Sequence, residues 1–195
     1  MTLAPVRTVA PAADLVSLAE AKAQCRVDDS DSDVLMTALI KAATDHLDGY
    51  SGVLGRALIT QTWAVDFGGF SELMRLPVGN LLAVSSITYY DSANVQQTLS
   101  ASVYAAHNDH FGPLLITKPD QQWPTTYARP DAVRVTWTAG YGATSAAVPA
   151  AIKQAALLLI GHWYDNRAAV NVGAAVAEVP FTVEALLQPY RRAQR

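Results

Sequence analysis

The sequence predicts an α+β protein in which N- and C-terminal helices form one helical bundle and an antiparallel β-rich subdomain is inserted between them. Apolar residues recur at spacings of three and four over 35–47, alternate with polar residues over 63–67 and 133–137, and fill almost every position of 155–160. We expect a flexible N-terminal arm over 1–16, the bundle over 17–57 and 148–167, the β-rich insert over 58–147, and a linker with a C-terminal docking tail over 168–195.

The first helix is predicted by a capping box. Ser17 precedes Glu20 by three residues, so the hydroxyl can accept from the third helical amide while the carboxylate accepts from the cap amide. An acidic turn over 28–33 then places carboxylates near the start of a second helix, where the helix dipole favours negative charge. This second helix is expected to run to about Tyr50.

Alternating patterns predict the strands of the insert. Trp63, Val65 and Phe67 alternate with more polar residues, and Val133 begins a similar run. Further strands are expected at 84–89, 103–106 and 114–117, separated by turns rich in Gly, Pro, Asn and Asp.

The last third returns to helix. Pro149 lies at the start of the first turn, and the segment through Trp163 is apolar almost all round, as in a core helix. We expect its end, with Trp163, Tyr164 and Arg167, to pack against other helices or to form a subunit interface. Thr182 can cap a final short helix over 183–187, which Pro189 stops.

Composition excludes several functional classes. Hydrophobic residues make up 51% of the chain and charged residues 16%, which indicates a folded core. The net charge of −3 provides no basic field for nucleic-acid backbone, so a nucleic-acid binding module is disfavoured. A single cysteine rules out a disulfide framework and a thiolate zinc cluster, and no apolar run is long enough for a membrane span.

One loop offers a competing catalytic interpretation. His107, Asp109 and His110 lie close together and would be the ligands of a small metal-dependent hydrolase, the alternative function. Their H-x-x-H spacing lies outside a long helix and does not give the geometry of the H-E-x-x-H motif, so a polar hairpin loop is the simpler interpretation. With no nucleophile elbow or phosphate loop in the chain, we expect no enzyme activity and no cofactor.

The tail combines an apolar face with a basic end, as docking peptides do. The residues expected to contact a partner are Val183, Leu186, Leu187, Tyr190, Arg191 and Arg192. Packing of the same segment back onto its own domain is the alternative.

The order of these elements resembles that of the phage head-tail connector (adaptor) proteins of the gene-product-six-like type, also described as the phiE125 gene-product-eight family. The resemblance is carried by 17–22, 33–50, 55–58, Leu76-Pro77, 84–91, Trp123-Pro124, 133–142, 148–167 and 186–191, nearly the whole chain from residue 17. Gene transfer agents, which are domesticated phage-like particles, carry adaptors of this type, and the alanine-rich composition suits one.

The resemblance implies a structural role. Proteins of this family form a ring, typically dodecameric, between the portal protein and the stopper or tail-proximal connector, and double-stranded DNA passes through its lumen without sequence recognition. By the same resemblance, residues 182–192 would reach the portal, and the protein would work in the particle neck after assembly in the bacterial cytoplasm, with no membrane partner.

Overall fold

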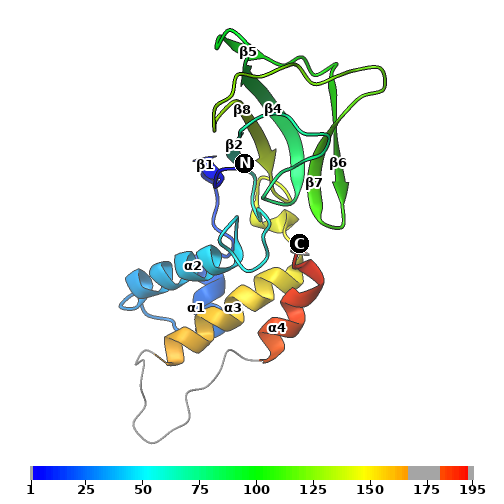
Figure 1. The fold of residues 1–195 in the computed structure, drawn as a ribbon. Coiled ribbons are helices and arrows are strands. Elements are labelled where there is room, and N and C mark those ends of the chain that lie inside the picture. Colours follow the sequence, from blue (N-terminus) through cyan, green and yellow to red (C-terminus); the bar gives the residue numbers. More distant parts are fainter. Residues whose placement is uncertain (1, 167–180, 193–195) are drawn as a thin grey trace, which may run out of the picture.

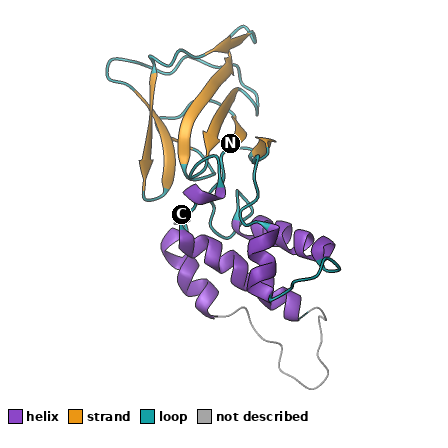
Figure 2. Cartoon of the chain, turned by 180° about the vertical axis from the view of Figure 1, so that it is seen from behind, coloured by secondary structure: helices purple, strands orange, loops and turns teal. Residues whose placement is uncertain are grey.

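The computed structural model describes residues 2–166 and 181–192, which form a helical lobe and a β lobe stacked end to end (Figure 1). The helical lobe contains α1 (Leu18–Cys25), α2 (Asp33–Leu47), α3 (Ala150–Asp165), α4 (Phe181–Leu187) and the 3-10 turn η2 (Gln188–Tyr190). The β lobe contains β1 (Val6–Val9), β2 (Gln61–Phe67), β3 (Met74–Arg75), β4 (Leu81–Tyr90), β5 (Gln96–Thr98), β6 (Tyr104–Asp109), β7 (Gly112–Thr117) and β8 (Val133–Ala139). A second 3-10 turn, η1 (Ser145–Ala147), leads into α3. The predicted α+β class is confirmed, and Figure 2 shows the same separation of helices and strands from behind.

The capping box of α1 forms as predicted. The Glu20 amide donates to the Ser17 hydroxyl at 3.2 Å, and the Ser17 amide donates to the Glu20 carboxylate at 2.7 Å. Lys153 of α3 donates to the same carboxylate at 2.9 Å, so the cap also ties α1 to α3. These hydrogen bonds hold the pKa of Glu20 at about 2, with the Ser17 amide as the largest cause.

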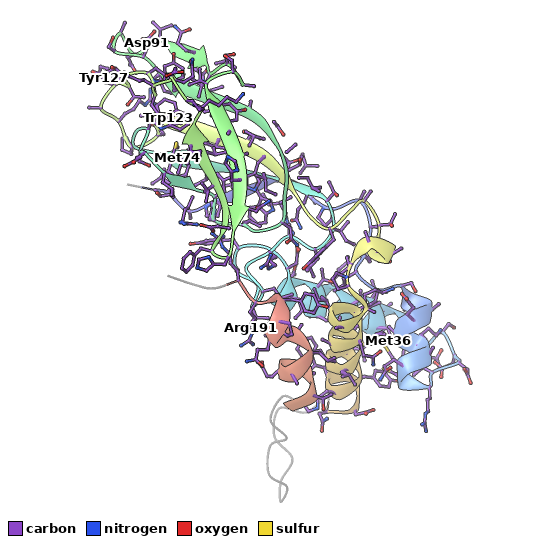
Figure 3. All side chains as sticks on the ribbon, turned by 90° about the vertical axis from the view of Figure 1, so that its right-hand side faces the viewer. Met36, Met74, Asp91, Trp123, Tyr127 and Arg191 are labelled. Atoms are coloured by element: carbon purple, nitrogen blue, oxygen red, sulfur yellow. The ribbon has the colours of Figure 1, made fainter. Side chains whose placement is uncertain are left out.

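Helix α3 is the centre of the helical lobe because it packs against α1, α2 and α4. Its nearly all-round apolar sequence is explained by this position, since Ile152 and Leu159 face a core that the other three helices complete. Met36 of α2 is fully buried in this core, whereas Met74 is fully buried in the β lobe (Figure 3). Each lobe therefore has a hydrophobic core of its own.

The β lobe contains two antiparallel sheets that share one core. The first has the order β1-β2-β8-β4-β5 and the second the order β3-β7-β6. Trp63, Val135 and Trp137 from the first sheet lie in the same buried cluster as Met74 and Leu115 from the second. Among the described helices, none has the length and apolarity that crossing a membrane requires.

The N-terminal region differs from the predicted flexible arm. Val6–Val9 form strand β1 at the edge of the larger sheet, and Leu15 and Val16 are fully buried in the helical core. The partner strand β2 lies more than fifty residues downstream, so no local sequence pattern predicts the pairing of the two strands. Similarly, α4 belongs to the bundle, although the sequence placed it in a separate tail.

Asp48, at the end of α2, joins the two lobes. Its carboxylate accepts from the Leu58 amide at 2.7 Å and from the Gln61 side chain at 2.9 Å, and Arg7 of β1 lies 3.6 Å away. Burial raises the pKa of Asp48, and the hydrogen bonds from Gln61 and Leu58 oppose that rise. The start of β2 and the N-terminal strand are therefore fixed to the helical lobe by one buried carboxylate.

Candidate functional site at the C-terminal segment

The C-terminal segment, by which we mean residues 181–192, packs on its own domain. Val183 and Leu187 are each 1% exposed and lie in the helical core, and Leu186 and Tyr190 pack partly buried against it. The sequence allowed the tail either to dock on a partner or to pack on its own domain, and in the isolated subunit it packs on its own domain. The apolar side chains expected to meet a partner are therefore directed toward α3 in the isolated subunit.

The opposite side of the segment is polar and accessible. Arg191 lies on the outer side of α4 (Figure 3) and forms an ion pair with Glu184 at 2.6 Å. The two side chains are 41% and 49% exposed, so this pair contributes little to stability and leaves both groups available to another molecule.

The end of the segment lies where the two lobes meet (Figure 1). The Arg192 amide donates to the Leu54 carbonyl at 3.0 Å, and its guanidinium donates to the carbonyls of Pro77 and Phe111. Arg56 reaches back from the helical lobe and donates to the Tyr190 carbonyl at 2.7 Å. The segment is thus fastened by arginine-to-carbonyl hydrogen bonds to the ends of both lobes.

Arg192 is held in a half-buried position beside other cations. Burial is the largest cause that lowers its pKa, and the positive charges of Arg56 and Arg75 lower it further. The same guanidinium donates to two backbone carbonyls, and the negative charge of Asp109 opposes the fall in its pKa. Sequence reasoning missed Arg56, because no local pattern shows which arginine will meet a distant carbonyl.

The predicted helix-end residues pack within the helical lobe. Trp163 meets His46 of α2 edge to face, with ring centroids 6.3 Å apart. The Tyr164 and Ser32 hydroxyls share a hydrogen bond of 3.1 Å, which links the end of α3 to the start of α2. Arg167 lies outside the described residues, as does the predicted linker before α4.

The predicted histidine loop is the end of strand β6 and the start of the β6–β7 turn, with His107 and Asp109 in the strand and His110 in the turn. Arg75 donates to both Asp109 oxygens, at 2.9 and 2.7 Å, and this bonding holds the pKa of Asp109 at about 2. His107 and His110 are exposed, and within the described residues no three His, Cys, Asp or Glu side chains gather closely enough to hold a metal ion. The described hairpin residues therefore do not form the set of metal ligands that the alternative function, a metal-dependent hydrolase, requires.

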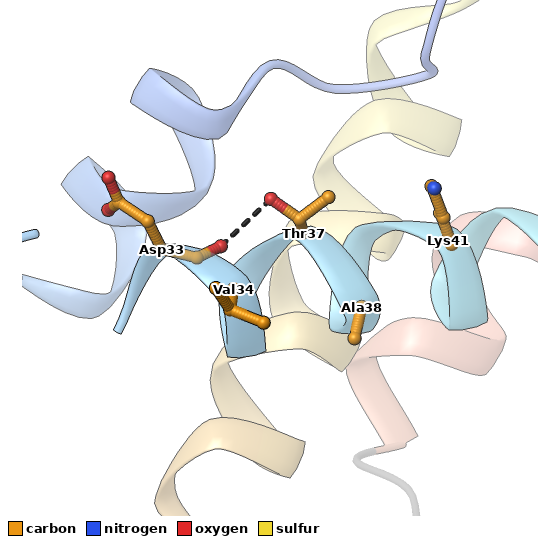
Figure 4. Close-up of a pocket in the computed structure, with 5 residues that line it drawn as sticks. All are labelled: Asp33, Val34, Thr37, Ala38 and Lys41. Atoms are coloured by element: carbon orange, nitrogen blue, oxygen red, sulfur yellow. Dashed lines mark hydrogen bonds between the residues drawn. The ribbon is translucent and has the colours of Figure 1, made fainter. Parts of the chain in front are cut away.

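Two hollows on the described part of the surface do not meet the requirements of a catalytic site. The hollow on the outer face of α2 has a volume of about 440 Å³ and is lined by Asp33, Val34, Thr37, Ala38 and Lys41 (Figure 4). Its marked hydrogen bond, from the Thr37 hydroxyl to the Asp33 carbonyl at 2.8 Å, lies within the helix. A smaller polar hollow contains Asp66, which a bidentate contact with Arg134 neutralises. Neither hollow positions a nucleophile beside a base.

Comparisons with known proteins point to particle assembly. The family model described as head completion protein matches residues 14–193. The fold resembles a chain in "Neck of empty GTA particle computed with C6 symmetry", with a TM-score of 0.78, 22% identity, and coverage of 99% of this chain and 97% of that chain. It also resembles chains in "Virion of native gene transfer agent (GTA) particle" and "Neck of native GTA particle computed with C12 symmetry", with TM-scores of 0.77 and 0.72 and the same 22% identity and 99% and 97% coverage. Among curated proteins, none matches the chain.

Proposed function

The chain belongs to the head completion protein family and is a head-tail connector. From that premise, we propose that it is a structural protein that assembles into a ring, dodecameric in the mature particle. This ring lies in the neck of a tailed phage or gene transfer agent, between the portal protein and the stopper or tail-proximal connector. Assembly takes place in the bacterial cytoplasm, and double-stranded DNA passes through the lumen.

The observation that carries this proposal is the fold match over 99% of the chain to neck proteins of a gene transfer agent particle. One of those necks was computed with C12 symmetry, which supports twelve copies around the axis. Rings arise when two different surfaces of one subunit meet head to tail and the rotation closes. The subunit is elongated, with its helices at one end and its strands at the other (Figure 1).

The charge distribution favours passage of DNA over its retention. The net charge is −3, and Arg75, Arg129 and Arg134 of the β lobe each face a carboxylate at 2.7 Å. Arginines that are already paired have less positive potential to offer to phosphates, whose contacts would hold the DNA in place. A lumen built from such surfaces lets DNA slide.

We assign the portal contact to the C-terminal segment. Arg191, exposed beside Glu184, is accessible in the isolated subunit and makes the first contact. Val183 and Leu187, together with the partly buried Leu186 and Tyr190, reach the portal only when α4 separates from α3, because they face the helical core. A polar first contact followed by apolar docking fits the two sides of this segment.

Binding to the immobilised cognate portal ring tests this assignment. Arg191→Glu reverses an exposed charge without altering the core, and we expect at least tenfold weaker binding at low salt. The matched control is Lys41→Glu, the same charge reversal at an exposed position on α2. Equal binding by wild type and Arg191→Glu would overturn the role of this residue, and failure of the wild type to bind would overturn the portal as partner.

A further inference from the structure

The adjacent arginines of the C-terminal segment have different surroundings. Arg191 pairs with Glu184 on the surface, whereas Arg192 lies half-buried among backbone carbonyls. The carbonyls that receive Arg192 come from separate parts of the chain: Leu54 after α2, Pro77 before β4, and Phe111 in the turn of the β6–β7 hairpin. Arg192 therefore connects the C-terminal segment to the helical lobe through its backbone amide, and to the residues after β3 and the β6–β7 turn through its guanidinium.

Glycines make room for this contact. A Cβ built on Gly112, where φ is +110°, would lie 2.5 Å from Arg192 Nε and 2.7 Å from Cζ. At Gly55, where φ is +61°, a Cβ would lie 3.5 Å from Arg192 Cβ, and at Gly79 it would lie 3.0 Å from Arg56 Cγ. The cradle around the two arginines thus depends on positions without side chains, and Gly112 is the tightest of them.

The hairpin has a second attachment, which does not involve the C-terminal segment. Arg75 of β3 bonds both Asp109 oxygens and lies over the Phe111 ring, 5.2 Å from its centroid. We therefore expect the hairpin to stay folded when Arg192 is withdrawn, while its turn loses the hydrogen bond from Arg192 to the Phe111 carbonyl. Loss of Arg192 should raise local opening without unfolding the lobe.

We propose that Arg192 is a positioning residue that couples the C-terminal segment to the β6–β7 hairpin, so that displacement of one loosens the other. The identity of the displacing partner rests on the proposed function, in which the portal draws away the segment. Portal binding at the helical end would then change the hairpin in the β lobe before the next neck component arrives. The coupling is reciprocal, because both sites share the same contacts.

Hydrogen–deuterium exchange of the isolated chain tests the first direction. Arg192→Ala should speed exchange of the amides in 108–112 about tenfold, the effect of losing a hydrogen bond to a charged donor. Arg191→Ala is the matched control and should leave those amides unchanged. Arg192→Lys keeps the charge but lacks the forked geometry that reaches both carbonyls, so it should restore only part of the protection. Unchanged hairpin exchange in Arg192→Ala would overturn the proposal.

A double-mutant cycle tests the reverse direction. Gly112→Ala places a methyl group against the guanidinium and should speed exchange in the C-terminal segment, residues 181–192. If displacement of Arg192 is the cause, Gly112→Ala should have no further effect on the segment in an Arg192→Ala background. Additive effects would show that Gly112 acts through the hairpin backbone alone and would contradict the coupling. Both measurements use the isolated subunit, so they stand or fall independently of portal binding.

Discussion

Replacing Leu187 by alanine tests whether the C-terminal segment is a structural part of the helical lobe. The side chain is 1% exposed and lies in the same buried cluster as Ile152 and Leu159 of α3. Removing the equivalent of three methylene groups costs about 2.4 kcal/mol in transfer free energy, and the cavity left behind raises the loss to about 3 kcal/mol. Leu186→Ala, the same change at a partly buried neighbour, should cost about half as much, ~1.5 kcal/mol.

Urea unfolding followed by circular dichroism at 222 nm measures both variants. With a slope of about 2 kcal/mol per molar, Leu187→Ala should lower the midpoint by roughly 1.5 M. The truncation of 180–195 should be destabilising for the same reason, because it removes Val183 and Leu187 from the core together. A midpoint for Leu187→Ala equal to that of wild type would refute the packing of α4 on α3 and the reasoning built on it.

Other predictions concern the contacts that join elements. Asp48→Ala removes the buried acceptor of the Leu58 amide and leaves Gln61 Nε2 with only its hydrogen bond to the Ile59 carbonyl, so it should lower the free energy of unfolding by about 3 kcal/mol, measured by urea denaturation. Because the pKa of Glu20 falls from 4.5 to about 2 on folding, its stabilisation is present above pH 4.5 and is lost as pH falls toward 2. The melting temperatures of wild type and Glu20→Gln should accordingly converge between pH 5 and pH 2, and a constant gap would contradict the assignment. Arg134→Ala removes a surface contact with Asp66 and should change stability by less than about 1 kcal/mol, with a large loss in thermal melting counting against the surface assignment.

Local sequence signals predicted the elements that depend on local physics. The Ser17 and Glu20 capping box starts α1, and the apolar spacing over 35–47 and the apolar run of 155–160 lie in helices α2 and α3 as predicted. The buried face of α2 is displaced by one residue from the predicted one, because Met36 and Ile40 are buried while Leu35 and Leu39 are only partly buried. The alternation beginning at Val133 corresponds to β8, where alternate residues face the core of the β lobe. These features need only near neighbours in sequence, so one chain suffices to find them.

Contacts between residues far apart in the chain could not be predicted from the sequence. Strand β1 forms because its backbone pairs with that of β2. The residues of β1 are all exposed, so they show no alternation of buried and exposed positions. The tail displayed an apolar face and a basic end, but the sequence does not say whether that face meets the chain's own α3 or another protein. Arg191 and Arg192 are indistinguishable in sequence, and only the carbonyl cradle beside Gly112 separates their environments.

Sedimentation velocity of the chain alone and mixed with its cognate portal ring tests the central claim, assembly into a neck ring, most directly. We expect added chain to co-sediment with the portal and to saturate at a fixed stoichiometry that matches twelvefold symmetry, as in the neck computed with C12 symmetry. Absence of association at low, moderate and high salt would contradict the account, because neither the charged first contact nor the apolar docking would then exist.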